Sequence, residues 1–177
     1  VINYYNHFFS VFNCNEFNLK WFTIGSRPKN YQNRSERKLS YIFEFLKDIY
    51  SFILLLIKKR NIAIVQVSPS FIPVPLVRDS VYLFIAKIFQ KKTITFIRGW
   101  SLEFEHKVTP NPRYFKYVFN LYKSSDAILV LAHKFKHTLV ELGFASNKIS
   151  VTRTMFMQKD IQKDRVCANE PLKFIFI

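Results

Sequence analysis

The chain has 177 residues, of which 49% are apolar and 18% aromatic; this composition excludes a disordered protein and can supply a buried core. The length is enough for one full domain and the start of another. A formal net charge of +15 favours contact with an anionic partner such as nucleic acid, a phosphorylated substrate or a membrane surface.

The first part of the chain combines a predicted strand, a basic loop and a long predicted helix. Residues 17–24 alternate in polarity as a strand does, and residues 25–38 are polar and basic. Residues 39–59 have the periodicity of a helix. Its apolar face is expected to contain Ile42, Phe45, Ile49, Ile53 and Leu56. The longest apolar run, residues 49–57, is too short to span a bilayer, so we expect a buried helix.

Strands and helices then alternate. The expected strands are residues 62–68, 93–97, 127–131 and 148–151, and the expected helices between them are residues 78–89, 112–123 and 134–142. Asn111 and Pro112 suit an N-cap and a first turn, and Gly143 suits a helix end. Because most of these strands are apolar throughout, the pattern predicts an α/β fold with a Rossmann-like parallel sheet covered by helices on both faces.

The two cysteines do not indicate a disulfide or zinc site, but they bear on the cellular compartment of the protein. Cys14 and Cys167 are far apart and have no ligand spacing, so a disulfide framework or a zinc site is not expected. Their use fits a reducing cytosol, and we expect a cytoplasmic protein.

In a parallel sheet of this class, ligands bind where the carboxyl ends of the strands open into loops. Three loops therefore become candidates for a site: residues 68–73, residues 98–106 and residues 132–136.

The order of these segments is similar to that of a known family. The stretch SSDAILVLAHKFKHTLVELGFASNKISV, residues 124–151, resembles the end of the N-terminal domain in family 4 glycosyltransferases of GT-B architecture. Residues 61–100 resemble the preceding half of that domain, where a strand, a helix and a strand ending in His-Gly recur. The resemblance covers roughly residues 62 to 155.

The resemblance implies a division of the chain. Residues 1–157 would form the N-terminal Rossmann-like domain that binds the acceptor, residues 158–171 a linker, and residues 172–177 the start of a donor-binding domain. The nucleotide-sugar donor would bind in the missing C-terminal domain, so no cofactor is expected in this chain, which alone would be inactive.

The resemblance also implies a function. The whole enzyme would transfer a sugar, with retention of configuration, to a polysaccharide or lipid-linked acceptor in bacterial surface glycan biosynthesis. Positive groups rather than a metal would stabilise the departing phosphate. Such an acceptor lies at the membrane, so we expect peripheral contact with the anionic inner leaflet and no nucleic-acid partner.

Arg98 and the residues after it are the first candidates for the site. Arg98 stands where relatives commonly carry histidine, and it cannot act as a base because it stays protonated, but it can bind a phosphate. Gly99 would permit a tight turn, Trp100 would stack on a sugar, and Ser101 would bind substrate. An ordinary strand-end turn with a structural tryptophan is the alternative.

The other candidates lie in the neighbouring loops. Glu103 is a candidate catalytic acid or base, with Glu105 and His106 close by, although a solvated loop is the commoner origin of such groups. Ser68 and Ser70 could bind sugar hydroxyls or simply form a turn. Lys134 and Lys136 place positive charge in the first turn of a helix, which suggests an anion opposite them, with solvated lysines as the alternative.

No metal is expected. His133 and His137 are four residues apart, as in some zinc sites, but no third ligand is apparent. The sequence also contains no Asp-x-Asp pair of the kind that holds a divalent cation in metal-dependent glycosyltransferases.

Two alternative functions stay open. One is a non-catalytic basic Rossmann-like module that binds membrane or RNA through residues 27–38. The other is a different nucleotide-using α/β enzyme whose active site lies elsewhere. A dinucleotide-dependent dehydrogenase is not expected, because no G-x-G-x-x-G follows a strand.

Overall fold

The computed structural model describes Phe22, Ile24 and residues 37–152. The chain divides into two compact units, and all described residues belong to the unit Trp21–Arg153. The domain limits predicted at residues 157 and 171 lie outside the described residues. Most of the strand predicted over residues 17–24 does too, and neither Phe22 nor Ile24 is in a strand.

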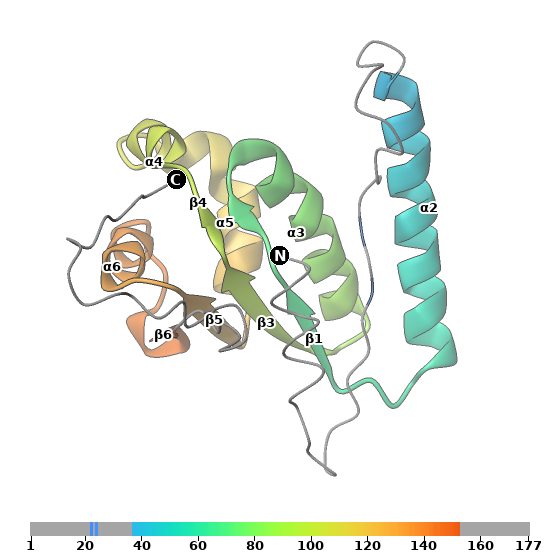
Figure 1. Ribbon diagram of the computed structural model, residues 1–177. Coiled ribbons are helices and arrows are strands. Elements are labelled where there is room, and N and C mark those ends of the chain that lie inside the picture. Colours follow the sequence, from blue (N-terminus) through green and yellow to red (C-terminus); the bar gives the residue numbers. More distant parts are fainter. Residues whose placement is uncertain (1–21, 23, 25–36, 153–177) are drawn as a thin grey trace, which may run out of the picture. The chain divides into compact units, whose positions relative to one another are not determined.

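The described unit alternates strands and helices around a parallel sheet (Figure 1). Its elements are α2 (Arg37–Lys58), β1 (Ile64–Val67), β2 (Ser70–Phe71), α3 (Pro73–Ile88), β3 (Lys92–Ile97), β4 (Gly99–Trp100), α4 (Leu102–Val108), η1 (Pro112–Phe115), α5 (Lys116–Lys123), β5 (Ala127–Val130), α6 (His133–Glu141), η2 (Ser146–Lys148) and β6 (Ile149–Val151). Strands β1, β3, β5 and β6 form one parallel sheet in that order, and β2 and β4 form a short parallel pair. The predicted α/β class, with a parallel sheet flanked by helices, is confirmed.

The register of the sheet aligns a row of buried side chains. Val67 pairs with Thr95, Thr95 with Ile128, and Ile128 with Ile149, and all four are buried. Of the residues that alternate with this row, Ile94 and Leu129 are half-buried and Ser150 is exposed, whereas Phe96 is buried. The face with the aligned row therefore carries most of the sheet's contribution to the core.

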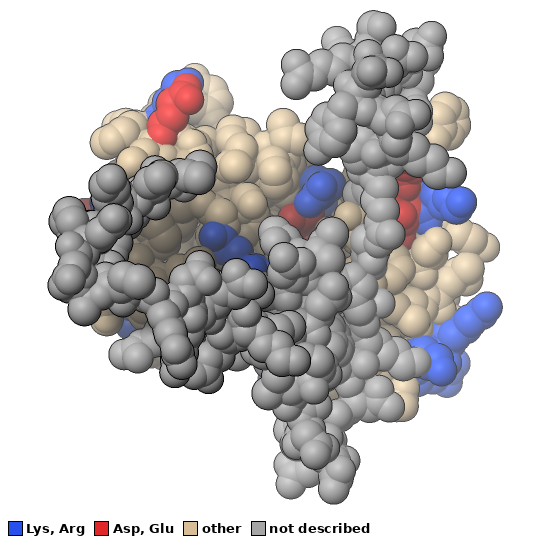
Figure 2. Space-filling model, viewed as in Figure 1, with Lys and Arg blue, Asp and Glu red and all other residues tan. Residues whose placement is uncertain are grey.

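Helices pack on this sheet and on one another. Helix α3 contacts β1 and β3, α5 contacts α3, and α6 contacts β5 and β6. Helix α2 lies beside α3 (Figure 1), where Phe45 and Phe52 meet the Tyr82 ring edge to face, with centroid distances of 6.1 and 5.4 Å. Ile42, expected on this inner face, is exposed instead. Basic side chains gather over the C-terminal end of α2 (Figure 2).

Helix α3 begins at Pro73, five residues before the predicted start. Pro73 and Pro75 lie in its first turn, where a helix has amide groups without intrahelical partners, so the missing N–H of proline costs nothing there. The sequence prediction placed Pro73 in a loop and began the helix at Arg78, and it was wrong at this boundary.

The loop predicted at residues 98–106 is in fact a short strand followed by a helix. Ser101 is the N-cap of α4, and its hydroxyl accepts a hydrogen bond from the Phe104 amide at 3.3 Å. Glu103 and Glu105 fall in the first turn, where negative charge is favourable to the helix dipole.

The helix ends were predicted with mixed success. Gly143 has φ of 83°, and the amides of Gly143 and Phe144 donate to Val140 and Leu139 at 2.8 and 3.0 Å, so the glycine ends α6 as predicted. Asn111 makes no side-chain cap, and Pro112 starts a 3-10 turn rather than the α-helix itself.

The amino ends of the strands are held by Asp126, immediately before β5. Its carboxylate accepts hydrogen bonds from the Thr93 amide at 2.9 Å and the Thr93 hydroxyl at 3.1 Å. Lys87 and Lys92 form ion pairs with it at 3.1 and 3.3 Å. The Thr93 amide, together with the two lysines, holds the pKa of Asp126 well below its usual range.

Ser125 makes a second polar link at this edge. Its hydroxyl lies 2.8 Å from the Thr95 hydroxyl, with both side chains buried. Lys148 donates to the carbonyl oxygens of Lys123 and Ser125 at 3.4 and 3.1 Å. The Ser-Ser-Asp start of the segment that resembles glycosyltransferases thus ties strands together in this chain.

Candidate functional site

The carboxyl ends of β1 and β3 continue into the short pair β2 and β4. Ser70 lies opposite Gly99, and Phe71 opposite Trp100. The Arg98 amide donates to the Pro69 carbonyl at 3.3 Å. Two of the predicted loops are therefore bound to each other along their backbones.

Gly99 is required by the close approach of Ser70. A Cβ atom at Gly99 would lie 2.6 Å from the Ser70 hydroxyl oxygen and 2.9 Å from its Cβ, closer than side-chain atoms tolerate. Gly99 does not have a positive φ, unlike Gly143, so its role is space rather than the tight turn that the sequence suggested. Ser70 is packed against this glycine.

Trp100 is the middle ring of an aromatic stack. Its ring lies 4.1 Å from the Phe71 ring and 4.2 Å from the Phe135 ring, with interplanar angles of 9° and 8°. Both faces of the indole are therefore covered, which contradicts the predicted role of stacking on a sugar. The structural alternative is the better description of Trp100.

Glu105 joins this stack to α6. Its carboxylate accepts from the indole N–H of Trp100 at 2.6 Å and from the Thr138 hydroxyl at 2.8 Å. Desolvation alone would raise the pKa of Glu105, but these hydrogen bonds and the nearby charge of Lys134 together outweigh it, and the pKa lies below its usual value. Glu105 thus positions β4 and α6, whereas the sequence suggested an acid or base or a solvated loop residue.

Glu103 is exposed to solvent on α4. Its side chain is 79% exposed and pairs with Lys107 at 2.6 Å, one helical turn along α4. The hydrogen bond and charge of Lys107 lower its pKa, whereas a general acid needs a pKa near the working pH. This geometry gives the predicted catalytic role of Glu103 no support.

Arg98 and Ser68 follow the ends of two adjacent strands. The Arg98 guanidinium is half-buried and lies 5.7 Å from the centroid of the Phe96 ring. The Ser68 hydroxyl is 3.5 Å from the side-chain amide of Gln66. Both groups stay at the carboxyl edge of the sheet, where the sequence placed them.

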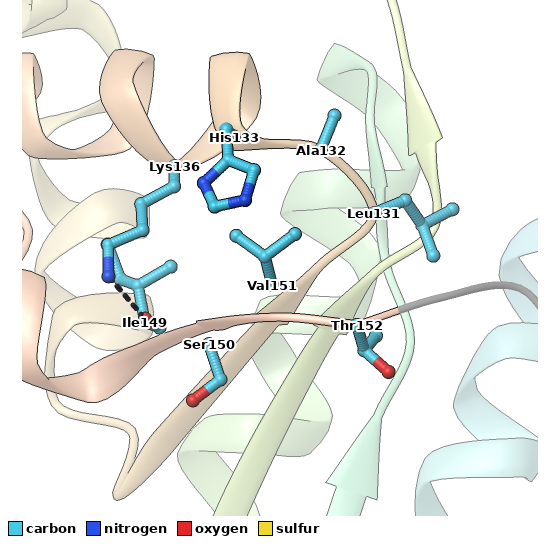
Figure 3. Close-up of a pocket in the computed structure, with 8 residues that line it drawn as sticks. All are labelled: Leu131, Ala132, His133, Lys136, Ile149, Ser150, Val151 and Thr152. Atoms are coloured by element: carbon cyan, nitrogen blue, oxygen red, sulfur yellow. Dashed lines mark hydrogen bonds between the residues drawn. The ribbon is translucent and has the colours of Figure 1, made fainter.

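An open cavity of about 670 Å³ lies at the carboxyl ends of β5 and β6 (Figure 3). It is lined by Leu131, Ala132, His133, Lys136, Ile149, Ser150, Val151 and Thr152. His133 and Lys136 come from the first turn of α6, and the rest from the two strands and the residues that follow them. The cavity therefore occupies the place in the sheet where ligands of α/β proteins bind.

Polar groups of the cavity come from both sides. Lys136 donates to the Ile149 carbonyl at 2.9 Å, which holds its ammonium group at the cavity wall (Figure 3). In the same view the His133 ring lies on the side of β6 toward which Val151 points. Ala132, the N-cap of α6, provides no side-chain cap, so the first amides of the helix offer donors to an anion or a hydroxyl.

The cavity brings together a different set of residues from the predicted one. Lys136 lines it, whereas Lys134, two residues earlier, is exposed and does not. Sequence reasoning weighed His133 only as a metal ligand and missed Ser150 and Thr152. Applying the strand-end rule to β6, as to the other strands, would have found these two.

A metal centre does not form within the described part of the chain. No three or more His, Cys, Asp or Glu side chains gather there in a way that could hold an ion. His137 instead contacts Glu141 at 3.3 Å, one turn along α6.

Comparisons with protein-family models, with curated proteins and with solved structures found no match to this chain. The fold class is therefore established by the structure, and the glycosyltransferase family remains a hypothesis from the sequence. Among the described helices, none is long and apolar enough to cross a bilayer.

Proposed function

We propose that this chain is the acceptor-side, N-terminal domain of a glycosyltransferase of GT-B architecture. The observation that carries the proposal is the open cavity at the carboxyl ends of β5 and β6, lined by His133 and Lys136. A cavity at this edge, with cationic and hydroxyl groups around it, suits a polyhydroxyl ligand that carries phosphate.

The cavity groups have distinct tasks in this proposal. The Lys136 ammonium and the first amides of α6 hold a phosphate or a sugar oxygen of the acceptor. The Ser150 and Thr152 hydroxyls, which lie on the side of β6 away from His133 (Figure 3), contact a part of the acceptor that extends past the strand in this scheme. Arg98, at the end of the neighbouring strand β3, supplies positive charge near the donor phosphate.

The reaction would be a direct sugar transfer. The anomeric carbon of the donor exchanges its bond to a phosphate oxygen for a bond to the acceptor oxygen, and the acceptor proton leaves with the nucleotide. A second domain binds the nucleotide sugar in this scheme. The positive groups at the sheet edge offset the charge that develops on the departing phosphate.

The test uses the complete reading frame and two matched pairs of variants. Transfer of labelled sugar from a panel of nucleotide sugars to lipid-linked acceptors is measured for His133→Ala and Lys136→Ala. His137→Ala and Lys134→Ala are the controls, because they remove the same chemistry from the same helix outside the cavity. We expect kcat/KM for the acceptor to fall by about ten- to a hundredfold in the cavity variants, the loss of a charged hydrogen bond, and to change little in the controls.

Two outcomes would reject the proposal. One is a reading frame that encodes no second domain able to bind a nucleotide sugar. The other is active enzyme in which cavity and control variants behave alike.

A non-catalytic membrane-binding module is the second candidate. It is favoured by the net charge of +15 and by apolar side chains that α2 leaves exposed. No nucleic-acid partner is proposed.

A further inference from the structure

Helix α2 has a second apolar side that the described unit leaves uncovered. Its inner side packs through Phe45 and Phe52 on Tyr82 of α3. Four other large apolar residues follow one another at helical spacing and are 49% to 71% exposed. These residues, the outer stripe of α2, are Phe43, Leu46, Tyr50 and Ile57. Spacings of three, four and seven residues place them along one side of the helix.

Exposed basic side chains border the outer stripe. Lys47 is four residues after Phe43 and three before Tyr50, so it neighbours both on the helix surface. Lys58, Lys59 and Arg60 are exposed where the helix ends, at the site of the basic group in Figure 2. An apolar stripe next to lysines is the arrangement of helices that lie at a membrane surface.

We propose that the outer stripe of α2 binds the surface of an anionic membrane. The exposed aromatic and aliphatic side chains enter the boundary between headgroups and acyl chains. The lysine stems run along that apolar surface while their ammonium groups stay among the anionic headgroups. Helix α2 lies in the plane of the interface, with its inner side still packed on α3.

The net charge of the chain favours an anionic membrane over a second copy of the chain, and the apolar stripe favours it over a nucleic acid. At a net charge of +15, two copies repel each other, which disfavours covering the stripe with a second copy. A nucleic acid would attract the lysines, but its phosphates would gain nothing from Phe43 or Tyr50. An anionic lipid surface uses both the basic and the apolar side chains. The inference does not depend on the proposed enzymatic function.

The test is binding of the 177-residue chain to vesicles. Flotation compares vesicles of phosphatidylcholine alone with vesicles that also contain phosphatidylglycerol, and no sugar donor is present. We expect binding only with the anionic lipid. The double variant Phe43→Ser, Tyr50→Ser should bind about tenfold more weakly or worse, because it removes two large apolar groups from the interface. Lys47→Gln should cost roughly fivefold, the contribution of one basic residue near an anionic surface.

Two aromatic residues elsewhere provide a matched control. Tyr114 and Tyr117, on η1 and α5, are 87% and 84% exposed. The variant Tyr114→Ser, Tyr117→Ser should bind vesicles as the unaltered chain does. Circular dichroism checks that both double variants are folded, which we expect because all four side chains are exposed.

A second measurement locates the helix directly. In the variant Phe43→Trp, fluorescence emission should shift to shorter wavelength and be quenched by brominated lipid, whereas in Tyr117→Trp the added signal should not respond. The inference is overturned by equal vesicle binding of the two double variants, or by no binding to anionic vesicles. It is also overturned if the outer-stripe variants break a dimer, or weaken binding to single-stranded RNA but not to lipid.

Discussion

The amino and carboxyl edges of the parallel sheet differ in the kinds of side chains that form them. At the amino edge, polar groups satisfy one another: Asp126 meets Thr93 and two lysines, and Ser125 meets Thr95. At the carboxyl edge, an aromatic stack packs one part, and an open cavity with His133 and Lys136 forms the other. The comparison teaches that polar residues that stand out in the sequence can have a structural role. Residues that could bind a ligand can be ones that the sequence gives little reason to select.

The largest expected effect comes from breaking the aromatic stack. Trp100→Ala removes a ring that Phe71 and Phe135 cover on both faces, and leaves Glu105 without one donor. We expect a loss of about 3 kcal/mol in the free energy of unfolding, at the low end for tryptophan truncation because the ring is only partly buried. Urea unfolding followed by circular dichroism measures it, and a loss as small as that of the exposed control Tyr117→Ala would contradict the described stack.

The second-largest loss of stability is expected from crowding at Gly99. Gly99→Ala places a methyl group against Ser70, and we expect it to cost about 1 to 3 kcal/mol, as overpacking does. Replacing the opposing residue as well, in Gly99→Ala with Ser70→Gly, should restore part of that stability through a favourable coupling energy. Additive losses in the same unfolding assay would show that the close approach of these two residues is not the cause.

A substitution at the amino edge of the sheet should have a smaller effect on stability, and that effect should depend on pH. Asp126→Asn should lower the free energy of unfolding at pH 7 by about 1 to 2 kcal/mol, a modest figure because the side chain is 35% exposed and solvent screens its ion pairs. The folded-state pKa is depressed, so this contribution is complete above the unfolded value near 4 and is lost as the pH falls below it. Unfolding at pH 7 and pH 3 should therefore show a difference between variant and wild type that shrinks in acid; a constant difference would contradict the assignment.

The smallest effect on stability is expected at the cavity. Lys136→Met keeps the long apolar stem and removes one hydrogen bond to Ile149, so we expect a change of about 0.5 to 1 kcal/mol. A thermal unfolding curve measures it. A loss as large as that of Trp100→Ala would mean that Lys136 holds the fold together and is not available to a ligand.

Local patterns predicted the regular elements well. Helical periodicity found α2, Gly143 marked the end of α6, and β-branched runs located β1, β3 and β5. The prediction failed at two helix starts, where local signals were present but were not used: the two prolines suit the first turn of α3, and Ser101 caps α4.

The candidate site was harder to predict, because its parts meet only in three dimensions. Phe135 is 35 residues from Trp100, and nothing in the sequence indicates that it covers the indole. Glu103 and Glu105 look equivalent in the sequence, yet one is solvated and the other joins β4 to α6. Lys136, a candidate from the sequence, lines the cavity, and its role there stays a prediction; Ser150 and Thr152 were missed because their strand was not given a site.

We propose that the carboxyl edge of the sheet binds a sugar acceptor that carries phosphate. Amide chemical shifts of the labelled chain, measured during titration with a short-chain prenyl diphosphate sugar, test it most directly. We predict shifts concentrated at residues 131–136 and 149–152, with little change around Asp126. Shifts centred on the amino edge, or none at all up to millimolar probe, would contradict the claim.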